Sequence, residues 1–288
     1  MTIYKEQAAK MYLLCVPKSN VEHNILEAYS IKDLNASTVK KMFKLIKQFG
    51  YVIIQLRSSQ HKENLLELSQ YFGSIVKHEH SDKHGIVPVT PLENSPGYVN
   101  TTTTELPLHT DGSFAVDPPK IVALQCEVAV ASGGLTTIGD GRLLYDYLTG
   151  TNPCGLLNLF QPDAITVQRE NRQSTKPIFE EHESRTRIRF RWDDAVKISV
   201  KPEDFPIIKT IKYFFNRPEN MLQFKLQPQQ IIIMDNSRIL HGRTAFIQGS
   251  KRWLNRVWFD GKSAYSEEFC FGFSPRETLE ELKQKCCL

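Results

Sequence analysis

Apolar residues near the start of the chain recur at the spacing of an α-helix. In the segment 37–50 they form one stripe, which Ser37 can cap at its start and Gly50 can end. The run YVIIQL that follows is continuously apolar and predicts a buried strand. The next stretch, HKENLLELSQYFG, predicts a second helix that ends at Gly73.

Beyond residue 120 the pattern changes to that of strands. A third helical stretch lies within EDFPIIKTIKYFFNRPENMLQFKL and precedes a further strand. Four other segments have the β-type pattern, namely 120–130, 185–192, 231–240 and 252–261. Helices followed by many strands predict an α+β fold, mainly β, in which the sheets form a jelly roll with flanking helices. No linker or repeat divides the chain, so we expect one domain over 1–288 with its core at about 35–262.

The segment RTRIRFRW contains the densest group of basic residues. Its alternation predicts a strand with arginines on a solvated face and apolar residues on the other. A strand that presents these arginines to an anion beside a pocket is the alternative. The arginines concerned are Arg185, Arg187, Arg189 and Arg191.

Composition and charge narrow the class of protein. The hydrophobic content of 41% is that of a soluble globular protein, and no apolar run approaches the length of a membrane span. The N-terminal residues lack the apolar core of a signal peptide, so a cytoplasmic location without a membrane partner is expected. A formal charge of +4 suits an anionic small molecule and gives no sign of a nucleic-acid partner. The oligomeric state cannot be inferred.

The six cysteines are irregularly spaced and include no Cys-x-x-Cys pair. This spacing argues against a disulfide framework and against a structural zinc site. The terminal Cys286-Cys287-Leu288 does not match a prenylation motif and is expected to be a frayed thiol tail.

The segment ELPLHTDGSF contains a candidate pair of metal ligands. His109 and Asp111 lie two residues apart, and on a strand such residues point to the same side. The pair would become the 2-His-1-carboxylate triad of a non-haem iron(II) oxygenase if one more histidine joined it. A single His-x-Asp occurs by chance in many proteins, so this prediction needs support elsewhere in the chain.

A second segment, QQIIIMDNSRILHGRTAF, supplies that support. It leads to His241, and Gly242 next to it lets another backbone approach closely. Arg252 and Arg256 lie four residues apart in the following strand and so share one face. Two arginines beside a metal site are costly unless an anion pairs with them, and arginine binds carboxylates in a bidentate manner. The C5 carboxylate of 2-oxoglutarate is such an anion.

These motifs, in this order and spacing, resemble the TauD/TfdA-like family of Fe(II)/2-oxoglutarate-dependent dioxygenases. The resemblance rests on HTDGSF, PPKIVALQC, SGGLTT, MDNSRILHGRTAF and RWLNRVW. It implies a double-stranded β-helix, an iron(II) held by His109, Asp111 and His241, and O2 as oxidant. It further implies that Thr136 and Arg252 bind the co-substrate 2-oxoglutarate, and that Arg256 lies by the 2-oxo acid or the substrate.

The resemblance implies oxidation of an unactivated C–H bond, with release of succinate and CO2. Because Asp111 is present, halogenation is not expected. Hydroxylation of a small, amino-acid-derived or anionic substrate is the main expectation, and desaturation or ring formation at the same iron is the alternative. A non-catalytic metal-binding or sensor protein of this fold and a cupin-like isomerase or lyase are the rival classes.

Two features depart from the family pattern or stay open. Leu108 stands where a tryptophan often precedes the first histidine, and the loop after the second helix offers both His78 and His80 as the substrate-contacting residue. The alternating His78, His80, Asp82 and His84 are expected to form a polar loop near the pocket mouth. Arg243 either supports the site or is a surface charge.

Overall fold

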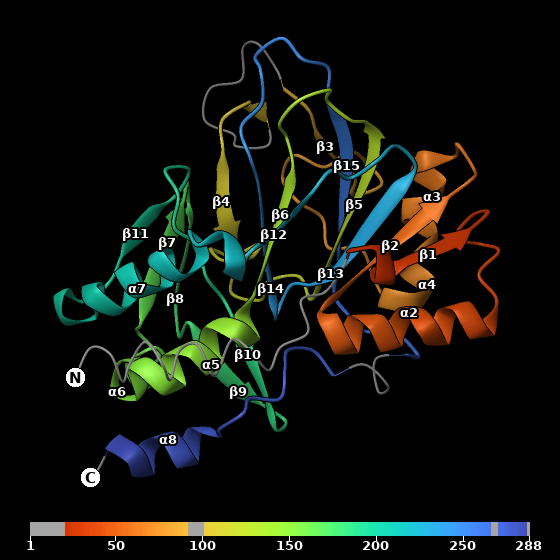
Figure 1. Ribbon diagram of the computed structural model, residues 1–288. Coiled ribbons are helices and arrows are strands. Elements are labelled where there is room, and N and C mark those ends of the chain that lie inside the picture. Colours follow the sequence, from red (N-terminus) through yellow and green to blue (C-terminus); the bar gives the residue numbers. More distant parts are fainter. Residues whose placement is uncertain (1–20, 92–100, 266–269, 287–288) are drawn as a thin grey trace.

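The computed structural model describes residues 21–91, 101–265 and 270–286 (Figure 1). Strands dominate, as predicted, and two larger sheets occupy the middle of the molecule. The first has six strands in the order β1-β2-β13-β5-β15-β3, and the second has four in the order β12-β6-β14-β4. All neighbours in both sheets pair antiparallel except β1 and β2, which pair parallel.

The bounds of these strands follow. The six-stranded sheet consists of β1 (Ile25–Ala28), β2 (Tyr51–Leu56), β3 (Val87–Val89), β5 (Ile121–Val128), β13 (Gln230–Asp235) and β15 (Trp253–Phe259). The four-stranded sheet consists of β4 (Leu106–His109), β6 (Thr136–Asp140), β12 (Leu222–Phe224) and β14 (Ile239–Arg243). Two small sheets add the pair β9 (Phe179–His182) and β10 (Arg185–Ile188), and the trio β7 (Ile165–Arg169), β8 (Arg172–Lys176) and β11 (Lys197–Ser199).

Helices cover the outer faces of the two larger sheets (Figure 1). On the six-stranded sheet these are α2 (Ala36–Phe49), α3 (His61–Glu67) and α4 (Ser69–Phe72). On the other side lie α5 (Gly141–Thr151), α6 (Pro153–Asn158) and α7 (Phe205–Phe215), followed at the C-terminal end by α8 (Leu279–Cys286). None of the helices in these described residues is long and apolar enough to span a bilayer.

Alternation along the strands divides the apolar residues between separate cores. Val52 and Ile54 of β2 pack toward α2, whereas Tyr51 and Ile53 belong to the core between the two sheets. Ile138 of β6 reaches the same inner core from the opposite sheet. Because successive residues of a strand point to opposite faces, both faces of the six-stranded sheet are buried. The inner face, which points toward the four-stranded sheet, can therefore line a cavity between the two sheets.

The predicted helices are present, with two differences in their ends. Asn35, not Ser37, caps α2, because its side chain accepts a hydrogen bond from the backbone N–H of Thr38. Gly50 ends this helix with a positive φ of 78°, as expected. The second predicted helix is divided into α3 and α4 at Leu68 and ends at Gly73.

The predicted strand 185–192 is shorter than expected, and its last arginine does not face solvent. β10 ends at Ile188, after which the chain leaves the small sheet. Arg191 is buried at 4% exposure and forms an ion pair of 2.8 Å with the buried side chain of Asp193. The prediction of a uniformly solvated arginine face was wrong here, because the alternation cannot reveal where a strand ends.

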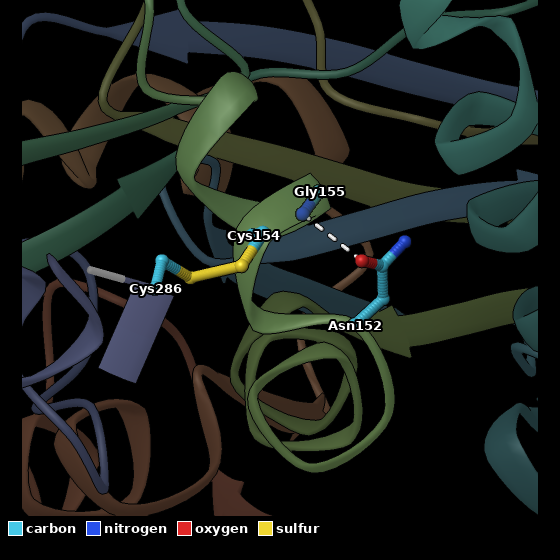
Figure 2. Close-up of a disulfide and its surroundings, with 4 residues drawn as sticks. All are labelled: Asn152, Cys154, Gly155 and Cys286. Atoms are coloured by element: carbon cyan, nitrogen blue, oxygen red, sulfur yellow. Dashed lines mark hydrogen bonds between the residues drawn. A yellow bond between two sulfur atoms is a disulfide. The ribbon is translucent and has the colours of Figure 1, made fainter. Parts of the chain in front are cut away.

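The expectation of no disulfide and a frayed C-terminal tail was also wrong. Cys154 of α6 and Cys286 at the end of α8 form a disulfide bond (Figure 2). Their separation of 132 residues leaves no local spacing from which the pairing could be recognised. On the other side of Cys154, the Asn152 side chain accepts a hydrogen bond from the backbone N–H of Gly155 at the start of α6 (Figure 2). Cys15 and Cys287 lie outside the described residues.

Replacing Cys154 by serine is expected to lower the free energy of unfolding by about 2–4 kcal/mol, because the crosslink restricts the unfolded chain. Urea denaturation under non-reducing conditions measures this change. The matched control is Cys270→Ser, since Cys270 is an exposed free thiol. If Cys154 in the native, unreduced protein reacted with a thiol reagent, the pairing would be refuted.

Candidate active site

Two neighbouring strands place His109 and His241 against each other. β4 and β14 pair antiparallel with His109 opposite His241, and the ring centroids lie 4.7 Å apart. A Cβ at Gly242 would collide with the backbone carbonyl oxygen of Leu106 in β4. Only glycine therefore allows the two strands to approach as they do, which fixes the distance between the imidazoles.

Asp111 joins the two histidines from the turn that follows β4. The strand ends at His109, so the predicted convergence arises from a strand end and a turn instead of a strand alone. The Asn236 side chain holds this turn, because it accepts from the backbone N–H of Asp111 at 2.8 Å and donates to its carbonyl oxygen at 3.0 Å. Asn236 follows β13, so the two sheets are joined at the site.

The three side chains form a compact set of candidate metal ligands. One ligand atom from each lies within 4.8 Å of the others, and all three residues are buried. Asp111 oxygens lie 3.4 Å from His109 Nε2 and 3.7 Å from His241 Nε2. Two imidazole nitrogens and one carboxylate match the facial triad of non-haem iron(II) sites.

The protonation states suit that role. Burial lowers the pKa of His241 to about 3, so its imidazole is neutral at physiological pH and has a lone pair to offer. Burial by itself would raise the pKa of Asp111. The charge of Arg256, with help from the two histidines, instead holds that pKa well below its usual range. The carboxylate is therefore ionised.

Hydrogen bonds orient the ligands. Arg256 Nη1 donates to both Asp111 oxygens at 3.2 Å, and the Trp258 indole N–H donates to Oδ2 at 2.8 Å. His109 Nδ1 lies 2.9 Å from the carbonyl oxygen of Pro107, which leaves Nε2 to face Asp111. Such contacts behind the ligands fix ring orientation and carboxylate position in metal sites.

A second group of residues lies in the same cavity around Arg252. Arg252 is 6% exposed, and its Nη1 is buried without a hydrogen-bond partner in the described part of the chain. Burial lowers its pKa to about 10, still far above neutrality. A buried, charged guanidinium with an unused donor is unfavourable unless an anion binds to it. Thr136, which is also buried, lines the same cavity.

The cavity that these residues line has about 790 Å³ of space, including its open mouth. Among its described lining residues one carboxylate, Asp111, faces several arginines. The five arginines are Arg169, Arg191, Arg243, Arg252 and Arg256. Arg169 lies at the end of β7 with its guanidinium carbon 5.4 Å from the centre of the Phe114 ring, which also lines the cavity. The cavity therefore has a strongly cationic wall.

The structure separates the two histidines that the sequence left open. His78 is 6% exposed, lines the cavity and packs edge-on against Trp258 with ring centroids 4.8 Å apart. His80 lies outside the cavity, near Glu79 and Glu170. Leu108 points away from the metal ligands into the core beneath α7.

Sequence reasoning assigned no role to Asn236, Trp258 or Arg169, and it left Arg243 open. Asn236 lies in the motif MDNSRILHGRTAF. Its position in a turn directly after an apolar strand was the sequence signal that could have indicated a role at the site. Arg169 had no such signal, because only the folding of the β7–β8 hairpin brings it to the cavity. Arg243 is buried at 4% exposure, so it is not a surface charge.

Parts of this chain are similar in sequence to known proteins. Gamma-butyrobetaine dioxygenase of Homo sapiens is 26% identical over 165 residues, covering 52% of this chain and 42% of that protein. The match therefore spans about two fifths of the relative's length. The 3-((Z)-2-isocyanoethenyl)-1H-indole synthase of Fischerella ambigua (strain UTEX 1903) is 23% identical over 242 residues, covering 78% of this chain and 87% of that protein.

Among solved structures, an asparagine oxygenase in complex with Fe(II), 2S,3S-3-hydroxyasparagine and succinate superposes with a TM-score of 0.65. Its sequence identity is 14%, and the alignment covers 88% of this chain and 89% of that one, so the likeness is one of fold. The sequence profile of the family described as taurine catabolism dioxygenase TauD, TfdA family matches residues 21–258. The resemblance found in the motifs is thus confirmed, and the chain belongs to the TauD/TfdA family.

Proposed function

We propose that this protein is an Fe(II)/2-oxoglutarate-dependent dioxygenase that hydroxylates a C–H bond of a small, anionic, amino-acid-derived substrate. The observation that carries the proposal is the buried set His109, Asp111 and His241 in one cavity with Arg252, whose Nη1 has no hydrogen-bond partner among the described residues. We also propose that the two larger sheets form the two sides of a double-stranded β-helix, in one domain over residues 1–288.

The residues present fit iron(II) and 2-oxoglutarate. His109, Asp111 and His241 would hold the metal through two imidazole nitrogens and one carboxylate. Bound iron(II) would supply the oxidising chemistry, in which O2 and 2-oxoglutarate are consumed, a substrate C–H bond is oxidised, and succinate and CO2 are released. A protein that only binds metal would have no use in the same cavity for the buried cation Arg252, whose Nη1 has no partner in the part of the chain that the structure describes.

The surrounding side chains would bind, orient and exclude water. Arg252 would pair with the distal carboxylate of 2-oxoglutarate, and the Thr136 hydroxyl would donate a hydrogen bond to it. The charge of Arg256 keeps Asp111 ionised, and the hydrogen bonds from Arg256 and Trp258 fix the orientation of its carboxylate. The low exposure of all three ligands keeps bulk water away from the reacting centre.

An anionic substrate is supported by the excess of arginines over carboxylates on the cavity wall. Arg191 is paired with Asp193, and Arg169 is a further cation on the wall. Burial, and then the charge of Arg256, lower the pKa of His78 to about 3, so this imidazole is neutral and adds no charge to the wall. A carboxylate on the substrate would offset this positive charge. The solved asparagine oxygenase, whose complex contains a hydroxylated amino acid, is consistent with an amino-acid-derived substrate.

Desaturation is the second candidate reaction on the same iron site. It is favoured by the similarity, over most of both chains, to a protein named as the synthase of an isocyanoethenyl indole. Hydroxylation and desaturation require the same metal ligands and the same 2-oxo acid. They differ in whether the oxidised product gains an oxygen atom or loses two hydrogens, which the mass of the product distinguishes.

Replacing His109, Asp111 or His241 singly by alanine is expected to abolish tight iron(II) binding, because each removes one of three protein ligands. Anaerobic titration of the apo-protein with iron(II) and 2-oxoglutarate measures this through the visible metal-to-ligand charge-transfer absorption of the chelate. Wild-type protein that binds iron but never develops the absorption would contradict the dioxygenase proposal and favour a metal-binding protein.

Replacing Arg252 by alanine is expected to weaken 2-oxoglutarate binding about ten- to a hundredfold, the loss of one charged hydrogen-bonded pair. Isothermal titration with 2-oxoglutarate under argon gives the affinity. Iron(II) binding without 2-oxoglutarate serves as the control and should stay unchanged. Equal affinity for 2-oxoglutarate in the two proteins would mean that Arg252 does not hold the distal carboxylate.

Replacing Trp258 by phenylalanine is expected to weaken iron(II) binding about tenfold to a hundredfold, because it removes the indole N–H that donates to Asp111. The ring and its packing are largely kept. A competition titration with a metal-binding dye measures the affinity. Trp253→Phe is the matched control, since Trp253 is partly exposed and outside the cavity; a similar loss in both variants would refute a role for the indole N–H.

A further inference from the structure

A second buried arginine, Arg243, lies beside the residues assigned to 2-oxoglutarate. It follows His241 by two residues in β14, so both side chains lie on the same side of the strand. In the antiparallel pairing with β6, Arg243 stands opposite Thr136. It lines the same cavity as Thr136 and Arg252, and it is 4% exposed. The neighbouring strands β14 and β6 carry Arg243 and Thr136, and Arg252 comes from the opposite sheet, where it directly precedes β15, so all three residues line the same cavity.

Arg243 and Arg252 also share an aromatic neighbour. The guanidinium carbons lie 5.1 Å and 5.6 Å from the centre of the Phe246 ring, within the range of cation–π contacts. Burial, and then the charge of Arg252, lower the pKa of Arg243 to about 10, so both guanidiniums remain charged near neutral pH. Two like charges held this close are unfavourable to each other, and a carboxylate bound near both would offset the repulsion.

Hydrogen bonds fix the position of the Arg243 guanidinium. Its Nη2 donates to the carbonyl oxygens of Thr102 and Thr104, each at 2.8 Å. These contacts tie the segment before β4 to β14 and hold the planar group in one orientation. A guanidinium immobilised in advance loses little entropy when it pairs with an anion.

We propose that Arg243 is a second cation at the distal-carboxylate end of the co-substrate site, where it acts with Arg252 as a positioning residue. The proposal rests on the proposed function and extends it. The paired charge makes the site selective for 2-oxo acids that carry a second carboxylate. A 2-oxo acid of the same length without that carboxylate gains nothing from Arg243.

The rival explanation is that Arg243 only maintains the fold through Thr102 and Thr104. The two explanations differ in how a substitution affects two related ligands. A loss of fold weakens every 2-oxo acid alike. A loss of charge at the distal carboxylate weakens 2-oxoglutarate and spares 2-oxopentanoate, which lacks that group.

The experiment is isothermal titration of the full chain, loaded with iron(II) under argon, with 2-oxoglutarate and separately with 2-oxopentanoate. The readout is the ratio of the two affinities, which needs no turnover. In Arg243→Gln we expect 2-oxoglutarate to bind about tenfold more weakly and 2-oxopentanoate to change less than twofold. Arg243→Lys keeps the charge but loses the planar donor pair, so its ratio should fall between those of the wild type and the Gln variant.

Arg189→Gln is the matched control. Arg189 is a half-buried arginine held by the Ala115 carbonyl oxygen at 3.3 Å and by Ser174 Oγ at 3.0 Å, and it does not line the cavity. In the Arg189→Gln variant, the ratio of the affinities for 2-oxoglutarate and 2-oxopentanoate should equal that of the wild type. Thermal melting of each variant shows whether it is folded.

Each outcome is decisive. An unchanged ratio in Arg243→Gln, whether both affinities fall together or neither changes, overturns the proposal. If the Gln variant does not fold, the Lys variant decides, and an unchanged ratio there overturns the proposal as well. A wild-type protein that does not prefer 2-oxoglutarate over 2-oxopentanoate refutes the proposed co-substrate itself, a result that differs from failure at Arg243 alone.

Discussion

The pairing of β14 with β4 on one side and β6 on the other is the constraint on which the site depends. It sets His241 opposite His109 and Arg243 opposite Thr136. A shift of one residue in this register would turn His241 to the outer face of the sheet. Gly242 allows the close approach to β4, so one residue without a side chain determines the spacing of His109 and His241, the two candidate imidazole ligands, and the position of Arg243 beyond them.

The second constraint is the imbalance of charge in the cavity. Among the described residues of the cavity wall, five arginines accompany one carboxylate, Asp111, and burial weakens the screening that water would provide. Within the protein this costs stability, and Arg252 Nη1 has no hydrogen-bond partner in residues 21–91, 101–265 and 270–286 to offset it. Anionic ligands would therefore contribute to the stability of the folded chain when they bind. Function and stability are linked in this way at the candidate site.

The sequence predicted those parts of the molecule that depend on local patterns. Continuous apolar runs predicted β2 and β13, and helical periodicity predicted α2 and α7, because these patterns reflect which faces are buried. The predicted strand 231–240 is, however, divided between β13 and β14, which lie in different sheets. Motif order led to His109, Asp111 and His241, which the fold brings together. The remaining features are non-local. Arg191 is buried because the chain leaves β10 after Ile188, and no alternation pattern records that change of direction.

The same limit explains why the sequence could not decide between His78 and His80. Both lie in one polar loop, and only the packing of His78 against Trp258 on a distant strand turns one of them inward. Asn236 is another example, because its amide contacts Asp111, which precedes it by 125 residues. In each case the information lies in contacts between segments far apart in the chain, which a single sequence does not display.

The bond between Cys154 and Cys286 has a topological consequence for the site. It closes a covalent ring that contains His241, Arg243, Arg252 and Arg256, while His109, Asp111 and Thr136 lie outside it on the preceding chain. A single cut in the backbone anywhere inside the ring leaves both fragments in one covalent molecule. The two halves of the candidate metal site could not diffuse apart after such a cut, and a nicked chain would still hold His109, Asp111 and His241 within reach of one another.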